Sequence, residues 1–212
     1  EFGDEAHKRR YLPEIADGDV MVCTGVTEPN AGTDTSSIET FAERDGDEYV
    51  VNGQKIWTSR VDVSDYLVLI ARTTAKDDVE KRTRGISMFL VDLDDAFDQG
   101  ALEIEQIPKT ASEFVHSYEL WFDDLEVPAD HLIGEEGEGF YQVLDGLNEE
   151  RLVIAAECIG LGAVALDRGQ AVHIHARKLG ECLEAGIGGD PQPQRALRHA
   201  GAAAVSVLRH GH

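Results

Sequence analysis

A loop near the start of the chain combines groups that could hold a phosphorylated or aromatic ligand. The segment CTGVTEPNAGTD, residues 23–34, begins as a strand end and continues into a Pro-Asn-Ala-Gly turn flanked by hydroxyl and acidic side chains. Such a turn presents several backbone N–H groups and Thr hydroxyls at one place, which suits a pyrophosphate or the edge of an isoalloxazine ring. An ordinary surface loop would have the same composition, so this segment alone leaves both interpretations open.

A second candidate is Trp57, in the segment YVVNGQKIWTS of residues 49–59. An indole in a β domain usually packs against its neighbours and has no other role. Here, however, it lies just after the Asn52-Gly53 dipeptide and directly before two hydroxyl side chains, Thr58 and Ser59. This position favours a ligand contact over simple packing.

These two segments belong to a longer series of motifs. In chain order the series reads VTEPNAGTD, YVVNGQKIWTS, GISMFLVD, ELWFDDLEVPADHLIGEEGEGF and LNEERLVIAAECIGLG. The series resembles the motifs of acyl-CoA dehydrogenases, which are FAD-dependent oxidoreductases that oxidise the Cα–Cβ bond of an acyl thioester. The resemblance runs from about residue 2 to residue 168 and implies a partial chain centred on the middle β domain of that family.

The resemblance assigns roles to individual residues. Trp57 would cover one face of FAD, while Thr58 and Ser59 would meet its edge, with Ser59 near N5. Thr33 stands where the family more often has Ser. The remaining flavin-lining residues would be Thr24, Val26, Thr27 and Gly32, and the substrate-binding residues would be Thr33, Asn148 and Arg151.

The reaction also needs a base that takes the α-proton as hydride leaves Cβ. Most family members place this base late in the C-terminal helical bundle, but one branch has a Glu immediately before the Arg of the ERL-type helix. In LNEERL that residue is Glu150, followed by Arg151. A solvated glutamate on a helix face fits the sequence equally well, so Glu150 and a residue outside the resemblance both remain candidates.

The surrounding pattern predicts an α+β fold with a middle β-barrel of the acyl-CoA dehydrogenase type. Short β-type runs fill residues 18–128, and Asp45-Gly46 and Asn52-Gly53 each predict a tight hairpin. A short helix over residues 4–12 should end at Pro13, and a buried helix should run from Gly139 to Asp167. The expected domains are an N-terminal helical fragment (1–17), the barrel (18–135), the first bundle helix (136–168) and a divergent tail (169–212).

The divergent tail departs from the family after Arg168. It holds three acidic and five basic side chains, although the whole chain has 41 acidic and 19 basic residues. We therefore interpret residues 169–212 as frame-shifted or disordered. His173 and His175 are spaced i, i+2 and do not share a helix face, so we expect no metal site there.

Composition limits which partners, source and cellular location are expected for the protein. A net charge of −22 disfavours nucleic acid as a partner and, with Arg outnumbering Lys, suggests a halophilic, haloarchaeal source. No apolar run is long enough to span a membrane, and the chain opens without an apolar or Arg/Ser-rich leader, so a cytoplasmic location is expected. The widely spaced Cys23, Cys158 and Cys182 suggest reduced thiols.

Two functional classes follow. The first is an acyl-CoA dehydrogenase of fatty acid β-oxidation that produces a trans-2-enoyl-CoA, passes electrons to an electron-transfer flavoprotein and assembles as a dimer or tetramer, as the resemblance implies. The second is a truncated, non-catalytic remnant that binds at most a flavin or a partner.

Overall fold

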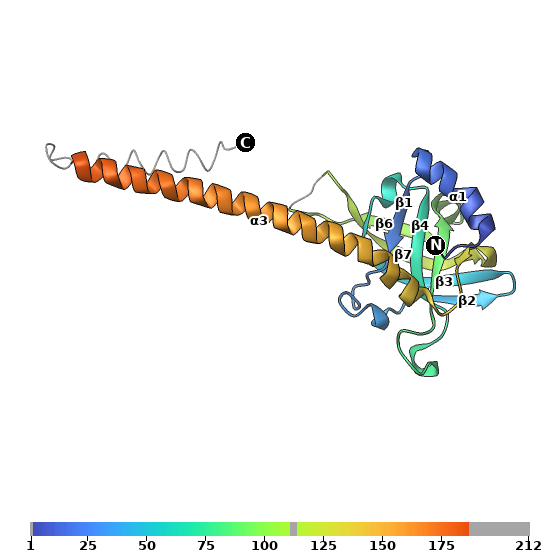
Figure 1. Ribbon diagram of the computed structural model, residues 1–212. Coiled ribbons are helices and arrows are strands. Elements are labelled where there is room, and N and C mark those ends of the chain that lie inside the picture. The colour runs from blue at the N-terminus through green and yellow to red at the C-terminus, as the bar shows by residue number, and fades with distance from the viewer. Residues whose placement is uncertain (1, 111–113, 187–212) are drawn as a thin grey trace. The chain divides into compact units, whose positions relative to one another are not determined.

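A computed structural model describes residues 2–110 and 114–186 of the 212-residue chain (Figure 1). The chain divides into two compact units, Glu1–Asn148 and Glu149–His212. The helices are α1 (Glu5–Asp17), α2 (Leu93–Asp98) and α3 (Gly139–Gly186). The strands are β1 (Val22–Gly25), β2 (Phe41–Asp45), β3 (Glu48–Ser59), β4 (Tyr66–Arg72), β5 (Ile86–Asp92), β6 (Leu102–Gln106), β7 (Ser117–Pro128) and β8 (Leu132–Ile133).

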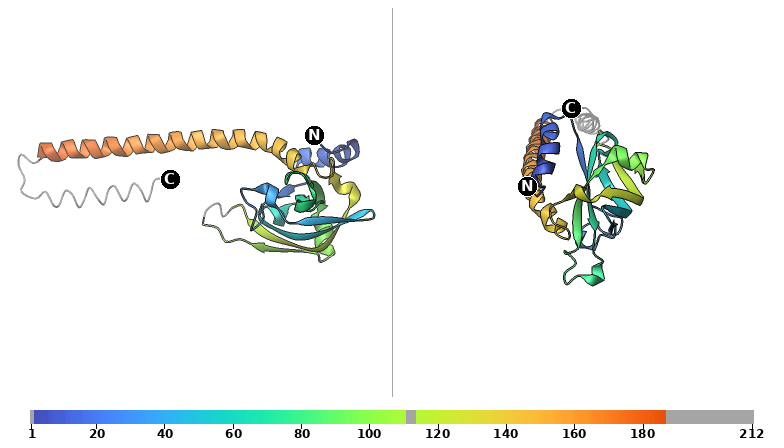
Figure 2. Two further views of the ribbon diagram at one scale, coloured as in Figure 1. Left: turned by 90° about the horizontal axis from the view of Figure 1, so that it is seen from below. Right: turned by 90° about the vertical axis from the view of Figure 1, so that its right-hand side faces the viewer.

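The first unit is built on one mixed, eight-stranded sheet. Its strand order is β6-β7-β3-β2-β4-β5-β8, and β1 pairs in parallel with β4. All other pairings are antiparallel except the short parallel contact between β2 and β4. Figure 2 shows the twist of this sheet from two further directions. The predicted strands and the mixed α and β content are confirmed, but the sheet is not closed, so a barrel is not confirmed.

Alternating side chains of the sheet form two apolar clusters. Because successive strand residues point to opposite faces, Leu67 and Leu69 of β4 enter the main core with Phe89 of β5, while Ile70 faces the other way. Ile70 belongs to a smaller cluster whose other fully buried members are Ala31, Ile38 and Ile86. Partly buried Phe140 and Val143, from the first turns of α3, also pack there. The loop between β1 and β2 is thus packed against the outer side of the sheet.

The Asp45-Gly46 hairpin is confirmed. Asp45 pairs with Glu48 across a two-residue turn, and Gly46 adopts the positive φ of 62° that such turns require.

The expected hairpin at Asn52-Gly53 is wrong, because β3 continues through both residues. Asn52 faces both Asp123 and Asp124 of β7 at a β-bulge, where its side-chain amide exchanges two 2.9 Å hydrogen bonds with Asp124. Gly53 has φ 144°, and a Cβ built on it would lie 2.6 Å from the Thr40 Cα. Asn52 and Gly53, whose residue types favour a turn, instead allow a β-bulge and a close approach of the Thr40 backbone.

Helix α1 is longer than expected and passes through Pro13. Proline adopts a helical φ but removes the hydrogen bond to the Arg9 carbonyl, and its ring crowds that carbonyl, which belongs to an exposed residue. Asp4 caps the N-terminus by accepting a hydrogen bond from the His7 N–H, and Gly18 ends the helix in the left-handed conformation, with φ 81°.

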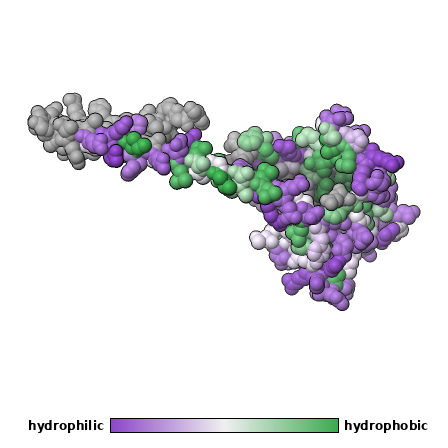
Figure 3. All heavy atoms as spheres, viewed as in Figure 1, coloured by the Kyte–Doolittle hydropathy of each residue, from purple (hydrophilic) through white to green (hydrophobic). Residues whose placement is uncertain are grey.

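Helix α3 also extends beyond its expected end near Asp167. Residues 168–186 are rich in the helix formers Ala, Leu, Arg, Lys and Glu, and the helix runs on to Gly186. The predicted tail therefore begins inside α3, and its remaining residues, 187–212, lie outside the described chain. The expectation that this helix is buried is wrong for its part in the second unit, where Leu152, Ile159 and Leu166 are each at least 70% exposed. Figure 3 shows apolar side chains at the surface along α3. None of the described helices is long and apolar enough to cross a membrane.

The contact between Gly53 and Thr40 predicts a specific stability effect. Gly53→Ala should lower the free energy of unfolding by about 3 kcal/mol, because the new methyl group meets backbone atoms and alanine disfavours positive φ. Urea unfolding followed by circular dichroism would measure the change. Gly46→Asn is the matched control, since Gly46 also has positive φ but faces open space. Equal stability of the two variants would contradict the close approach.

Candidate functional site

The structure brings the two candidate segments side by side. The Ile56 N–H donates to the Thr27 carbonyl at 2.8 Å, and Lys55 Nζ donates to the Val26 carbonyl at 3.1 Å. The end of β1 and its following loop therefore run beside the end of β3. Although about 30 residues separate them in sequence, the two segments that carry the predicted flavin residues lie side by side in the first unit.

A β-bulge gives Trp57 its unusual conformation. Lys55 pairs with Leu120 and Thr58 with Tyr118, so Ile56 and Trp57 together face the single residue Glu119 of β7. Trp57 has φ 65°, a value that bulky residues rarely adopt, and its side chain is 53% exposed. Strained backbone that presents a large aromatic side chain to solvent is a recognised feature of ligand-binding sites.

The predicted flavin residues differ in exposure. Val26 and Thr27 are half-buried, while Thr58 is 1% exposed and its hydroxyl has no hydrogen-bond partner among the described residues. A Cβ on Gly25 would come within 3.7 Å of that hydroxyl, so the absence of a side chain at residue 25 keeps a small space open beside it. The exposed members of the set are Thr24, Gly32, Thr33, Trp57 and Ser59.

The predicted base and part of the substrate set lie on α3. Asn148 is the last residue of the first unit, and Glu150 and Arg151 belong to the second unit, which is described separately. Glu150 is exposed on its helix, as are Ile154 and Glu157 at i+4 and i+7. The roles of these residues stay predictions.

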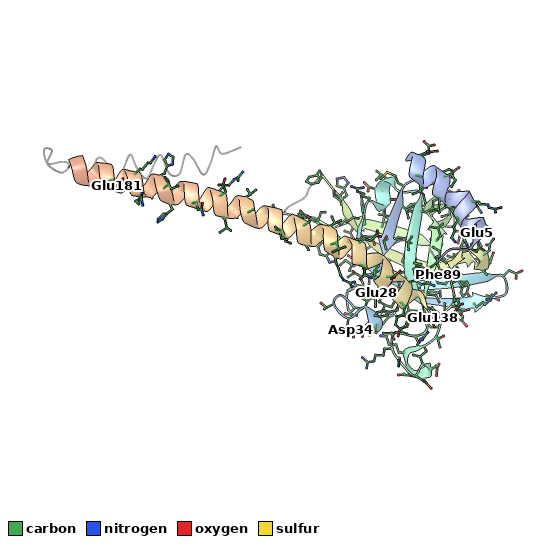
Figure 4. The ribbon with its side chains drawn as sticks, viewed as in Figure 1. Glu5, Glu28, Asp34, Phe89, Glu138 and Glu181 are labelled. Atoms are coloured by element: carbon green, nitrogen blue, oxygen red, sulfur yellow. The ribbon has the colours of Figure 1, made fainter. Side chains whose placement is uncertain are left out.

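A buried ion pair, for which the sequence predicted no role, lies beside the predicted flavin residue Val26. Lys55 is fully buried and Glu28 is 5% exposed, and Lys55 Nζ lies 2.7 Å from Glu28 Oε1 (Glu28 is labelled in Figure 4). The Glu28 carboxylate also accepts hydrogen bonds from the Glu39 N–H at 2.6 Å and the Thr40 N–H at 3.0 Å. The sequence carried a signal only for Lys55, which continues the alternation of the inward-facing Tyr49 and Val51 along β3. Glu28 had no such signal.

Burial and pairing act in opposite directions on these two groups. Burial lowers the pKa of Lys55 to about 8, and the neighbouring Glu28 carboxylate opposes that decrease. Burial would raise the pKa of Glu28, but the charge of Lys55 and the hydrogen bonds from Lys55, Thr40 and Glu39 outweigh it and lower the pKa. Both groups are therefore charged at neutral pH.

A third buried charge lies next to this pair in the structure. Arg72, at the end of β4, is 2% exposed and donates hydrogen bonds to backbone carbonyls. Burial lowers its pKa, and the nearby Glu28 charge opposes this. Within the described ranges, no group of three or more His, Cys, Asp or Glu could hold a metal ion.

Comparisons with known proteins agree with this architecture. A family model for the acyl-CoA dehydrogenase middle domain matches residues 23–125. The short-chain-specific acyl-CoA dehydrogenase of Clostridium acetobutylicum is 36% identical over 185 residues, covering 87% of this chain and 47% of the relative. A solved acyl-CoA dehydrogenase from Geobacillus kaustophilus has a TM-score of 0.67 and 35% identity, covering 73% of this chain and 40% of that chain.

A further solved match comes from a structure of the electron transferring flavoprotein of Acidaminococcus fermentans. It has a TM-score of 0.61 and 36% identity, covering 69% of this chain and 37% of the matched chain. This chain thus spans less than half the length of each of these relatives.

The lowered pKa of Glu28 predicts how stability responds to acid. A carboxylate whose folded-state pKa lies below its ordinary value of 4.5 stabilises the fold above that pH, and this contribution is lost as the pH falls through the folded-state pKa. Glu28→Gln should cost about 3 kcal/mol at pH 7 by leaving Lys55 unpaired, and the difference from wild type should shrink below pH 4.5.

Urea unfolding of both proteins between pH 3 and pH 7 would measure this difference. Glu39→Gln is the control, because Glu39 lies in the same loop but its carboxylate is exposed and pairs at 3.2 Å with Lys76. A constant difference between wild type and Glu28→Gln across this pH range would disprove the assigned role of the Glu28 charge.

Proposed function

We propose, from the premise that residues 23–125 form a middle domain of the acyl-CoA dehydrogenase family, that this chain is part of an FAD-dependent enzyme. The enzyme oxidises the Cα–Cβ bond of an acyl-CoA thioester to give a trans-2-enoyl-CoA. The observation that carries the proposal is the exposed Trp57, held at a strained bulge beside the loop of residues 24–33.

The side chains around Trp57 suit the binding of a flavin. The exposed indole offers a flat apolar surface against which one face of an isoalloxazine ring can stack. Thr24, Thr33 and Ser59 are exposed and carry hydroxyls for its polar edge. The Thr58 hydroxyl, between Trp57 and Ser59 on β3, is buried and has no hydrogen-bond partner among the described residues. Because these donors are uncharged and sit on paired strands or a packed loop, they can orient the ring without a charged side chain.

FAD, when bound, supplies the acceptor for the hydride that leaves Cβ. In the proposal Glu150 takes the α-proton, which requires its carboxylate to be ionised before substrate binds and to lie near the substrate α-carbon. Thr33, Asn148 and Arg151 are proposed to contact the substrate, and an electron-transfer flavoprotein is proposed to reoxidise the cofactor.

Flavin binding by the chain is the first expected outcome. Titration of the purified 212-residue chain with FAD should shift the flavin absorption bands and quench tryptophan fluorescence, because Trp57 would stack on the ring. Trp57→Ala should weaken FAD binding by about tenfold, the equivalent of about 1.4 kcal/mol. Phe97→Ala is the control, since Phe97 is an exposed aromatic residue on α2 and not on the segments that carry the proposed flavin residues. A wild-type chain that binds no FAD would favour the non-catalytic alternative.

The role of Glu150 requires a separate experiment. In a form of the protein that includes the full length of the family fold, Glu150→Gln should lose at least about 10³-fold in kcat while retaining FAD. The glutamine keeps the shape of the side chain but cannot accept the α-proton. Glu149→Gln, its neighbour on α3, is the control and should keep near-normal turnover. Near-normal turnover of Glu150→Gln would show that another residue is the base.

A further inference from the structure

The loop between β1 and β2, residues 26–40, contains four of the eight proposed flavin-binding residues but little regular structure. Its secondary structure is a single 3₁₀ turn, Thr35–Ser37, and a bridge in which Glu28 and Ala31 exchange backbone hydrogen bonds of 3.2 and 3.1 Å. A loop of this kind needs tertiary contacts to fix its backbone. Two apolar contacts are provided by buried Ala31 and Ile38.

Besides backbone hydrogen bonds from Ile56 to Thr27 and from Arg72 to Thr40, the loop is held by three buried charged side chains. Glu28 joins the two ends of the loop, because its carboxylate accepts from the backbone N–H groups of Glu39 and Thr40. Lys55 connects this carboxylate to β3 and also donates to the Val26 carbonyl at the start of the loop. The backbone at both ends is therefore held by directional hydrogen bonds with buried side chains.

Arg72 holds the second half of the same loop. Its Nε donates to the Ile38 carbonyl at 2.9 Å, and Nη2 donates to the Ser36 carbonyl at 2.6 Å. The same guanidinium donates to the carbonyls of Arg82 (2.8 Å), Arg84 (3.3 Å) and Thr74 (3.5 Å) in the loop between β4 and β5. No ion-pair partner lies within 4.0 Å of Arg72 in the described part of the chain. The whole donor set of this arginine is thus committed to fixing two loops.

We propose that Glu28, Lys55 and Arg72 are positioning residues, which hold the loop of residues 26–40 in the geometry that receives the flavin. This inference rests on the proposed function, but it assigns a task to three residues that need not touch the ligand. Thr27, Gly32 and Thr33 lie between the points at which the loop is held. Buried charges are costly to desolvate, and apolar side chains of similar size could stabilise a loop as well. Charged hydrogen bonds differ from apolar packing because they specify where each carbonyl and N–H must lie.

Two variants separate positioning from general stability. The double variant Glu28→Gln with Lys55→Met removes both charges together, so no unpaired charge remains in the interior. Arg72→Lys keeps the positive charge but loses the planar group that reaches several carbonyls at once. Lys76→Met is the matched control, because Lys76 pairs with Glu39 of the same loop at the surface.

Hydrogen–deuterium exchange of each full chain, read by mass spectrometry without FAD, is the first measurement, and an FAD titration is the second. Exchange in residues 26–40 should accelerate by about tenfold in both variants, while β4 and β5 keep wild-type protection. The Kd for FAD should rise by about tenfold in the same variants, and Lys76→Met should match wild type in both measurements.

The possible outcomes distinguish this inference from the proposed function. Folded variants whose residues 26–40 exchange at the wild-type rate would overturn the positioning role. Uniform loss of protection across the sheet in both variants would also overturn it, because the three residues would then support the whole fold. Faster exchange of residues 26–40 in variants of a chain that never binds FAD would confirm that the three residues order the loop. The same result would contradict the proposal that the loop receives a flavin.

Discussion

The buried ion pair between Glu28 and Lys55 is the interaction on which the candidate site depends. Two charges are removed from water where a loop crosses the end of β3, and each is compensated by the other and by backbone groups of the loop. The arrangement is favourable only when all partners are in place, since a single missing partner leaves a charge unpaired in a nearly dry environment. The order of the loop and the integrity of the pair are therefore coupled.

The two bulges in the contact between β3 and β7 place the site relative to this pair. At one bulge Asn52 and Asp124 satisfy each other, and Gly53 lets the Thr40 backbone approach β3. At the other, the extra residue turns Trp57 outward while Lys55 and Thr58 still point inward. In a regular strand, residues 55 and 57 would point to the same face. The bulge lets Lys55 point inward and Trp57 outward, while Thr58 points inward again.

Several features of the fold could be predicted from local sequence. The β-type runs and the Asp45-Gly46 turn predict strands and a hairpin because side-chain alternation and positive φ act over a few residues. The same reasoning was wrong at Asn52-Gly53, at Pro13 and at the end of α3. In each case the residue type permits a break but does not require one, and its neighbours decide whether the element continues.

The sequence by itself determined the types and order of the residues at the site, including Trp57 between the Asn-Gly dipeptide and Thr58-Ser59, and it carried the family motifs. Only the tertiary structure decided that Glu28, Lys55 and Arg72 are buried and that they bind the loop through its backbone. In an acid-rich sequence nothing distinguishes Glu28 from a solvated carboxylate, because its partners, the Glu39 and Thr40 N–H groups and Lys55, come from later in the chain. Burial and pairing arise between segments distant in the chain, and these interactions exist only once the sheet has formed.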